Sequence, residues 1–106
     1  MIVYISGKIT GTNDYVERFN KAEEVLKSRG YNVLNPVRFN GHLPSDSTWS
    51  DYMRNCLKCL ADADAIYMLK GWGSSKGAAI EYRLAYDLGM QFMYEEDFEN
   101  DLSEMS

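Results

Sequence analysis

Residues 65–94 read AIYMLKGWGSSKGAAIEYRLAYDLGMQFMY, and the predicted fold depends on the pattern in this stretch. Residues 65–69 form an apolar run typical of a buried strand, and residues 71–77 form a glycine-rich loop. The helix expected after the loop has an apolar stripe with the spacing of one helix face: Ile80, Leu84 and Leu88. Residues 91–94 predict another strand. A strand that leads through a helix into a second strand is the repeating unit of a parallel sheet.

The chain before this stretch contains two more strand–helix pairs. Residues 2–5 predict a buried strand that stops at Ser6 and Gly7. The helix after it has an apolar stripe at helical spacing: Tyr15, Phe19, Ala22 and Leu26. Residues 31–34 predict the second strand, and residues 49–61 predict the second helix. The stripe of that helix has the same spacing: Trp49, Met53, Cys56 and Leu60.

A polar segment, residues 36–47, separates the second strand from the second helix and is punctuated by glycine and proline. A loop of this length indicates a functional flap. Thr48 and Asp51 have the spacing of a capping box, in which each side chain bonds the backbone N–H of the other residue. We therefore expect the second helix to begin at this pair.

The alternation of three helices with four apolar strands predicts an α/β fold. We expect a three-layer, Rossmann- or flavodoxin-like domain with a four-stranded parallel sheet. Right-handed crossovers favour the strand order 2-1-3-4, in which the order changes direction between the first and third strands. Ligands of such sheets bind at that point, beyond the carboxyl ends of the strands. The loops there are residues 6–12 and 70–77, so we expect a pocket between them.

Length and charge limit the class of protein. The 106 residues fit one domain, which we expect to span residues 1–95. Carboxylates crowd the last dozen residues, so residues 96–106 are predicted to be an acidic, flexible tail. The net charge of −5 argues against a partner that is a nucleic acid polymer. No segment resembles a membrane span or a signal peptide, so we expect a cytoplasmic protein with no membrane partner.

The cysteines and the histidine argue against a metal or redox site. Cys56 and Cys59 fall inside the predicted second helix, well past its first turn, where two buried small apolar residues are the simpler interpretation. His42 is the one histidine of the chain and offers no metal cluster. We therefore expect neither a metal nor a cofactor.

Glu81 and Tyr4 are the candidate catalytic residues. Glu81 is expected in the first turn of the third helix, beside the glycine-rich loop, where the helix dipole favours its ionised form. A carboxylate held there could attack an electrophilic carbon of a ligand. Tyr4 lies near the end of the first strand, so its hydroxyl could bond that carboxylate at the floor of the pocket. Position alone also fits simpler roles, an acid that only complements the dipole and a tyrosine of the core.

The two loops supply the candidate ligand-binding residues. Glycines let the backbone approach a ligand, and Trp72 could stack on a flat ring. Lys8 and Lys76 flank the loops and could meet a phosphate. An ordinary flexible connection with solvated lysines is the alternative interpretation. The candidates are Ser6, Gly7, Lys8, Gly71, Trp72, Ser74, Ser75 and Gly77.

Three stretches, taken together, match the motifs of one family: residues 2–7 (IVYISG), 57–69 (LKCLADADAIYML) and 77–85 (GAAIEYRLA). They resemble the first strand and turn, the helix-to-strand segment and the G-x-x-x-E-x-x-x-A nucleophile helix of the nucleoside 2-deoxyribosyltransferase-like proteins. The resemblance is to the small branch of unknown function that is common in phages and bacteria. It covers the chain nearly to residue 94.

The resemblance implies a nucleoside or nucleotide N-glycosidase or deoxyribosyltransferase. By the family's chemistry, Glu81 would attack the anomeric carbon of the sugar through an oxocarbenium-like transition state. Tyr4 would orient Glu81, and Ser6 and Gly7 would line the sugar or phosphate site. The resemblance also implies a homodimer or higher homo-oligomer, because relatives complete their pockets with residues from a neighbouring subunit.

Two positions depart from the family pattern. Many relatives have an acid that assists the leaving base, eight residues before the aspartate that leads into the third strand. Here that aspartate is Asp64, and the position of the acid is Cys56. Asp51 lies about 140° round the helix from it and is a poor substitute. Lys8 stands where close relatives usually have proline, and its charge favours a phosphorylated ligand. An enzyme, a protein that sequesters or senses a nucleotide without turnover, and a scaffold with a vestigial pocket all remain open.

Overall fold

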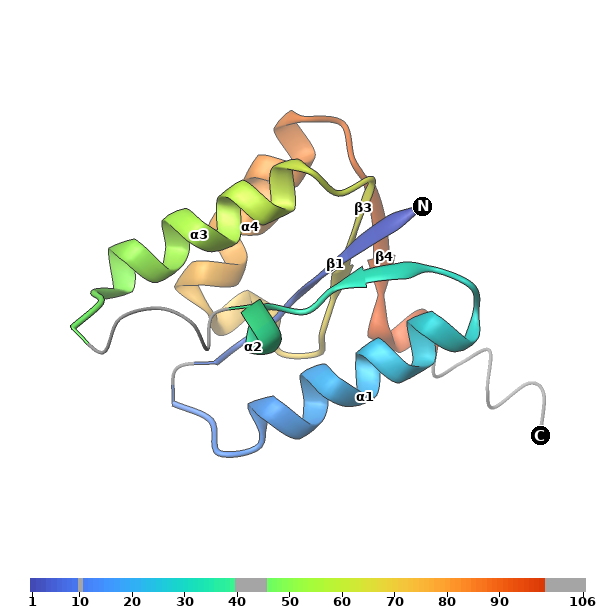
Figure 1. The fold of residues 1–106 in the computed structure, drawn as a ribbon, viewed down its shortest axis with the longest axis horizontal. Helices are drawn as coiled ribbons and strands as arrows, with labels where there is room; N and C mark the ends of the chain where they lie inside the picture. Colours follow the sequence, from blue (N-terminus) through green and yellow to red (C-terminus); the bar gives the residue numbers. More distant parts are fainter. Residues whose placement is uncertain (10, 40–45, 99–106) are drawn as a thin grey trace.

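The structure, a computed structural model, describes residues 1–9, 11–39 and 46–98 of the chain. Its parallel strands form one sheet in the order β2-β1-β3-β4 (Figure 1). The strands are β1 (Ile2–Ser6), β2 (Asn32–Leu34), β3 (Ala65–Met68) and β4 (Gln91–Tyr94). The predicted α/β fold and strand order are confirmed. The order changes direction between β1 and β3, which places a ligand crevice at their carboxyl ends.

Helices cover both faces of this sheet. They are α1 (Tyr15–Ser28), α3 (Trp49–Ala61) and α4 (Lys76–Asp87). Figure 1 shows α1 on one face and α3 with α4 on the other. Successive side chains of a strand point to opposite faces. β1 therefore contributes to two cores, since Val3 and Ile5 pack on the α1 side whereas Tyr4 packs on the side of α3 and α4.

The apolar stripe predicted for α4 is wrong at Ile80 and Leu88, although Leu84 packs against the core, whereas α1 and α3 bury most of their stripes. Ile80 and Leu88 are 37% and 55% exposed. The buried residues of α4 are instead Ala78, Glu81 and Ala85. How closely a helix can approach its neighbours depends on the side chains at the contact. Two alanines let α4 lie close to the sheet, and the same face carries a carboxylate inward.

The segment between β2 and α3 begins with a short helix where a loop was predicted. This helix is α2 (Pro36–Phe39), and its proline has the fixed φ that suits a first helical position. Residues 40–45, the centre of the predicted flap, lie outside the described residues. The predicted capping box is confirmed, because Asp51 N donates to Thr48 Oγ1 at 3.1 Å and Thr48 N donates to Asp51 Oδ2 at 3.0 Å.

After β4 the chain packs against the α1 side of the sheet as far as it is described. Residues 95–98 are helical, and the Phe98 ring meets the Tyr67 ring edge-to-face with 5.1 Å between centroids. Residues 99–106 of the predicted tail lie outside the described residues, so the tail and the domain boundary at residue 95 stay predictions. None of the described helices is long and apolar enough to span a bilayer.

Candidate functional site

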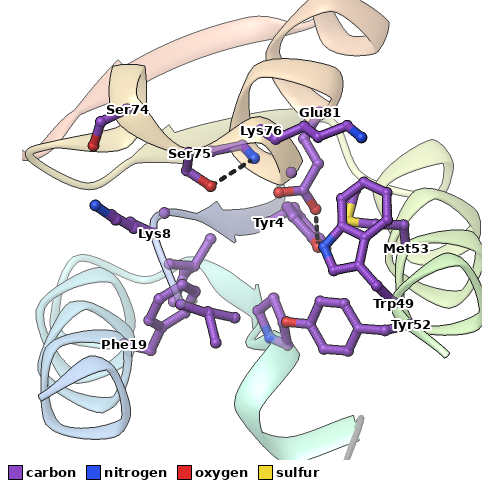
Figure 2. Close-up of a pocket in the computed structure, with 16 residues that line it drawn as sticks. Tyr4, Lys8, Phe19, Trp49, Tyr52, Met53, Ser74, Ser75, Lys76 and Glu81 are labelled. Carbon is purple, nitrogen blue, oxygen red and sulfur yellow. Dashed lines mark hydrogen bonds between the residues drawn. The ribbon is translucent and has the colours of Figure 1, made fainter. Parts of the chain in front are cut away.

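A cavity of about 350 Å³ opens at the carboxyl edge of the sheet, between the segments that follow β1 and β3. Its volume lies in the usual range of ligand pockets, about 300–1,000 Å³. The described lining residues are Tyr4, Ile5, Gly7, Lys8, Ile9, Phe19, Pro36, Trp49, Tyr52, Met53, Ser74, Ser75, Lys76, Gly77, Ala78 and Glu81 (Figure 2). The pocket therefore lies where the two predicted loops meet.

Glu81 is the buried carboxylate of this cavity. Its side chain is 5% exposed and reaches from α4 to β1. The Tyr4 hydroxyl donates a hydrogen bond to Glu81 Oε2, drawn as a dashed line in Figure 2. Ser6 Oγ donates to the other oxygen, Oε1, at 2.8 Å. The structure thus brings the two candidate catalytic residues together and adds Ser6 as a second donor.

The protonation of this group is set by burial. Burial raises the pKa of Glu81 from its ordinary value of 4.5 to about 7, and the hydrogen bonds from Tyr4 and Ser6 oppose the rise. Burial and the nearby Glu81 carboxylate raise the pKa of Tyr4 well above its ordinary value of 10.0. At neutral pH, Tyr4 is therefore a neutral donor, and Glu81 gains and loses its proton close to neutrality.

The helix dipole contributes less than expected to this setting. α4 begins at Lys76, and Ser75 is its N-cap, with a hydroxyl that accepts from Ala78 N at 3.2 Å. Glu81 consequently lies in the second turn of the helix and not in the predicted first turn. The field of a helix terminus falls off within the first turn. Desolvation and hydrogen bonding thus determine the state of this carboxyl.

The predicted ligand-binding residues divide into three groups. Those that line the cavity are Gly7, Lys8, Ser74, Ser75 and Gly77. Ser6 is fully buried and contacts Glu81, and it is absent from the described wall of the cavity. Gly71 and Trp72 are absent from that wall too and border a second hollow of about 380 Å³ beside the end of β4.

The direction of Trp72 has a local cause. Gly71 has φ +84°, a left-handed conformation that suits glycine, and begins a 3-10 turn over Trp72–Ser74. This turn directs the Trp72 ring onto Tyr82 of α4, with 4.7 Å between ring centroids and 12° between planes. The ring predicted to stack on a ligand therefore stacks on the protein.

Helix α3 contributes side chains to the cavity wall that were not predicted to lie there. Trp49 and Met53 belong to the apolar stripe predicted for this helix and Tyr52 was not singled out, yet all three line the cavity. Trp49 is 44% exposed, and Lys76 Nζ lies 4.8 Å from the centre of its ring. The available signal was position, because a crossover helix starts at the carboxyl edge of the sheet. The first residues of its stripe therefore lie at the pocket, and the later ones reach the core.

A second acid is absent from the described wall, where Glu81 is the one carboxylate. Cys56, at the position of the expected acid, is 1% exposed and within hydrogen-bonding reach of the Tyr4 hydroxyl. Asp51 caps α3 and is exposed. In the part of the chain that the structure describes, no group of three or more His, Cys, Asp or Glu side chains could hold a metal ion.

The comparison with protein families gives a match over most of the chain. A family model described as "Domain of unknown function (DUF4406)" matches residues 1–94. The chain belongs to this family. The matched residues include every strand of the sheet and every described residue of the cavity wall, so the site lies within the DUF4406 domain. None of the curated proteins matches the sequence.

A solved structure shares the fold. It is the 2-deoxyribosyltransferase of the psychrotolerant bacterium Bacillus psychrosaccharolyticus, with a TM-score of 0.72 and 20% sequence identity. The alignment covers 89% of this chain and 71% of that one. The resemblance inferred from the three sequence stretches is thus confirmed at the level of the fold. Membership of a phage or bacterial branch stays a prediction.

Proposed function

We propose that the protein is an N-glycosidase or deoxyribosyltransferase that acts on a nucleoside or its 5′-monophosphate, with Glu81 as the nucleophile. The observation that carries the proposal is the setting of Glu81, a buried carboxylate held by two hydroxyls at the wall of a cavity of ligand size. A fold shared with a 2-deoxyribosyltransferase supports the same class of reaction by analogy.

The proposed reaction has two displacements at one carbon. In the first, the ionised carboxylate of Glu81 attacks the anomeric carbon, and the C–N bond breaks with its electron pair leaving on the base. In the second, water or another base attacks the same carbon and releases the carboxylate, which gives hydrolysis or transfer. The sugar is oxocarbenium-like in each transition state, so a fixed negative charge beside it stabilises both.

The proton for the departing base needs a source other than a second carboxylate. Since Glu81 is the one carboxylate in the described wall, the base takes its proton from solvent or from a neutral or cationic side chain of that wall. A general acid often contributes about a hundredfold or more to the rate. We therefore expect turnover to be slow and most favourable for bases that leave readily.

The cavity has different chemistry on its two sides. Figure 2 shows Trp49 and Tyr52 to one side of Glu81, and Lys8 and Ser74 to the other. A flat base fits against the aromatic side, because every base has a flat face that can stack on an aromatic ring. Sugar hydroxyls or a phosphate fit beside Lys8 and Ser74, which supply a cation and a hydroxyl. Lys76 adds a second cation at the Trp49 ring, and the Phe19 ring lies on the side of Lys8.

A second candidate function is favoured by Cys56. A protein that only binds a nucleotide, to sequester or sense it, needs the same cavity but no acid for the leaving base. The thiol at the position of the expected acid is buried against Tyr4 and is absent from the described wall of the cavity. This alternative uses the aromatic and polar sides of the cavity in the same way and makes no use of the charge on Glu81.

The proposal includes a homodimer or higher homo-oligomer in the cytoplasm. Ile80, Tyr86 and Leu88 of α4 are exposed, and large apolar side chains on a surface favour contact with another chain. Sedimentation over a range of concentrations should give at least twice the mass of one chain. A single-chain mass at every concentration would contradict this part of the proposal.

Base release separates the two candidate functions. The purified protein is incubated with 2′-deoxynucleosides, ribonucleosides and their 5′-monophosphates, and free base is measured by chromatography. We expect release that the substitution Glu81→Ala abolishes. Release that survives this substitution would exclude Glu81 as the nucleophile. Binding measured by calorimetry without any release would favour the binding protein.

A further inference from the structure

Ser6 has a place in the structure that differs from the one predicted for it. Its side chain is 0% exposed, and it is absent from the described wall of the cavity. Its hydroxyl donates to Glu81 Oε1 at 2.8 Å. A ligand in the cavity would therefore meet Glu81 but not the hydroxyl of Ser6.

Tyr4 and Ser6 reach the same carboxylate because of strand geometry. Residues two apart on a strand point to one face, and here each bonds a different oxygen of Glu81. The backbone under them is fixed, since Leu69 N donates to Ser6 O at 2.9 Å. The next residue, Gly7, runs so close to Leu69, the residue after β3, that an added Cβ would lie 2.8 Å from the Leu69 side chain. Both donors thus stand on a rigid support.

Two donors fix the plane of the Glu81 carboxylate, whereas one does not. The last torsion of a glutamate side chain has a broad energy profile, so a single bond from Tyr4 leaves the carboxylate able to rotate. A second bond from Ser6 to the other oxygen stops that rotation. The carboxylate lone pairs that accept no hydrogen bond from Tyr4 or Ser6 then point in one fixed direction relative to the cavity. A fixed direction of attack is a large part of what an enzyme supplies to a displacement reaction.

We propose that Ser6 is a positioning residue, which holds Glu81 in its attacking orientation and does not bind the ligand. The inference rests on the proposed function of Glu81 as nucleophile. It replaces the role that the family resemblance implied, in which Ser6 lines the sugar or phosphate site. Tyr4 and Ser6 then form a two-point clamp supplied by a single strand.

The clamp can be tested without any turnover, by titrating Glu81. Protein labelled with ¹³C at the glutamate side-chain carboxyl is followed by NMR across the pH range, and Glu81→Gln identifies the resonance. A bond to the ionised form lowers a carboxyl pKa, so Ser6→Ala should move the Glu81 midpoint upward by about one pH unit. An unchanged midpoint in Ser6→Ala would overturn the proposal.

Two further variants make the titration specific. Ser74→Ala removes a hydroxyl that lines the cavity but donates to Gly71 O at 3.0 Å, so the Glu81 midpoint should not move. Ser6→Cys replaces the hydroxyl by a somewhat larger thiol that is a weak donor, so its midpoint should fall between those of the wild type and Ser6→Ala. If Ser6→Ala fails to fold by circular dichroism, a midpoint in Ser6→Cys equal to the wild-type value overturns the proposal instead.

Kinetics then distinguish positioning from ligand binding. With 2′-deoxyadenosine 5′-monophosphate as the probe at pH 9, where Glu81 is ionised in both proteins, Ser6→Ala should lower kcat by about tenfold and change KM by less than about twofold. A raised KM with unchanged kcat would mean that Ser6 binds the ligand and would refute the positioning role. If the wild type releases no base, the proposed function fails, and the titration still decides the contact between Ser6 and Glu81.

Discussion

Two glutamates of this protein expose similarly little surface and have opposite surroundings. Glu23 on α1 and Glu81 on α4 are 4% and 5% exposed. Arg38 Nε donates to both oxygens of Glu23, at 2.8 and 2.9 Å, its Nη2 lies 2.7 Å from Oε2, and Lys27 Nζ lies 3.6 Å from the same oxygen. Glu81 is held by the neutral hydroxyls of Tyr4 and Ser6.

The partners decide what each carboxylate can do. Burial alone would raise the pKa of Glu23, but the hydrogen bonds and charges of Arg38 and Lys27 hold it below its ordinary value. Burial raises the pKa of Glu81 to about 7, since two hydroxyls compensate the desolvation only in part. A carboxylate matched by cations stabilises the fold, here by joining α1 to α2. A carboxylate matched by hydroxyls at a cavity keeps its charge available for a ligand.

The largest expected contrast between the two glutamates is in activity. Glu81→Gln removes the proposed nucleophile and nearly preserves the shape of the side chain, so base release should fall by at least about a thousandfold. Glu23→Gln, the matched control, should change the rate by less than about twofold, because Glu23 lies outside the described wall of the cavity. A steady-state assay on both purified variants measures this. Equal losses of rate in Glu81→Gln and Glu23→Gln would show that the two glutamates do not differ in their role in the reaction.

The next contrast is the dependence of stability on pH. A folded-state pKa raised from 4.5 to about 7 means that the contribution of Glu81 to stability is complete below 4.5 and is lost as the pH rises through 7. Relative to Glu81→Gln, the wild type should lose about 3 kcal/mol of unfolding free energy between pH 4 and pH 8. Urea unfolding of both proteins at the two pH values measures the difference. A difference that stays constant would show that the environment of Glu81 does not disfavour its charge.

The pH dependence of activity separates the glutamates in another way. Since the nucleophile must be ionised, kcat/KM should rise by about tenfold per pH unit below pH 6 and level off above pH 7. Glu23→Gln should leave the midpoint of this rise unchanged, because Glu23 is already ionised throughout the range. A profile that falls with rising pH over the same interval would mean that Glu81 works as an acid and not as a nucleophile.

The smallest expected effect is that of Glu23→Gln on stability. The substitution leaves Arg38 beside a neutral amide, which should cost about 1–2 kcal/mol at pH 7, since Arg38 is largely exposed and water screens the pair. The folded-state pKa of Glu23 is lowered, so its contribution is present above 4.5 and is lost as the pH falls through the lowered value. Urea unfolding at pH 7 and pH 3 should show a smaller cost at pH 3 than at pH 7. A cost of the same size at both pH values would point to packing and not to charge.

Much of the fold could be predicted from local patterns. Apolar runs gave the strands, helical spacing gave the buried faces of α1 and α3, and crossover handedness gave the strand order. The spacing of apolar residues gave the wrong buried face for α4, where Ile80 and Leu88 are exposed while Ala78 and Ala85 face the core. Hydrophobicity does not show which face of a helix makes a close approach, because small side chains make that approach possible.

The positions of site residues could be predicted where they follow from the sheet topology, but not where they depend on the conformation of a single loop. Glu81 and Tyr4 meet because both lie near the carboxyl edge on the same face of the sheet. The alternation of side chains along β1 would have placed Ser6 beside Tyr4, a signal that was present in the sequence. The tryptophan at the cavity is Trp49 and not Trp72, because the left-handed conformation of Gly71 turns the Trp72 ring away. Such a turn is a property of one backbone angle.

The proposed nucleophilic role of Glu81 can be tested most directly by trapping the glycosyl-enzyme that it predicts. A 2′-deoxy-2′-fluoro nucleoside slows both displacements, because fluorine disfavours an oxocarbenium-like transition state. After incubation, the intact mass of the protein should increase by one fluorodeoxyribosyl group, and peptide mapping should place the group on Glu81 in the wild type and in Glu23→Gln. Base release with no covalent adduct, or an adduct on another residue, would contradict the account.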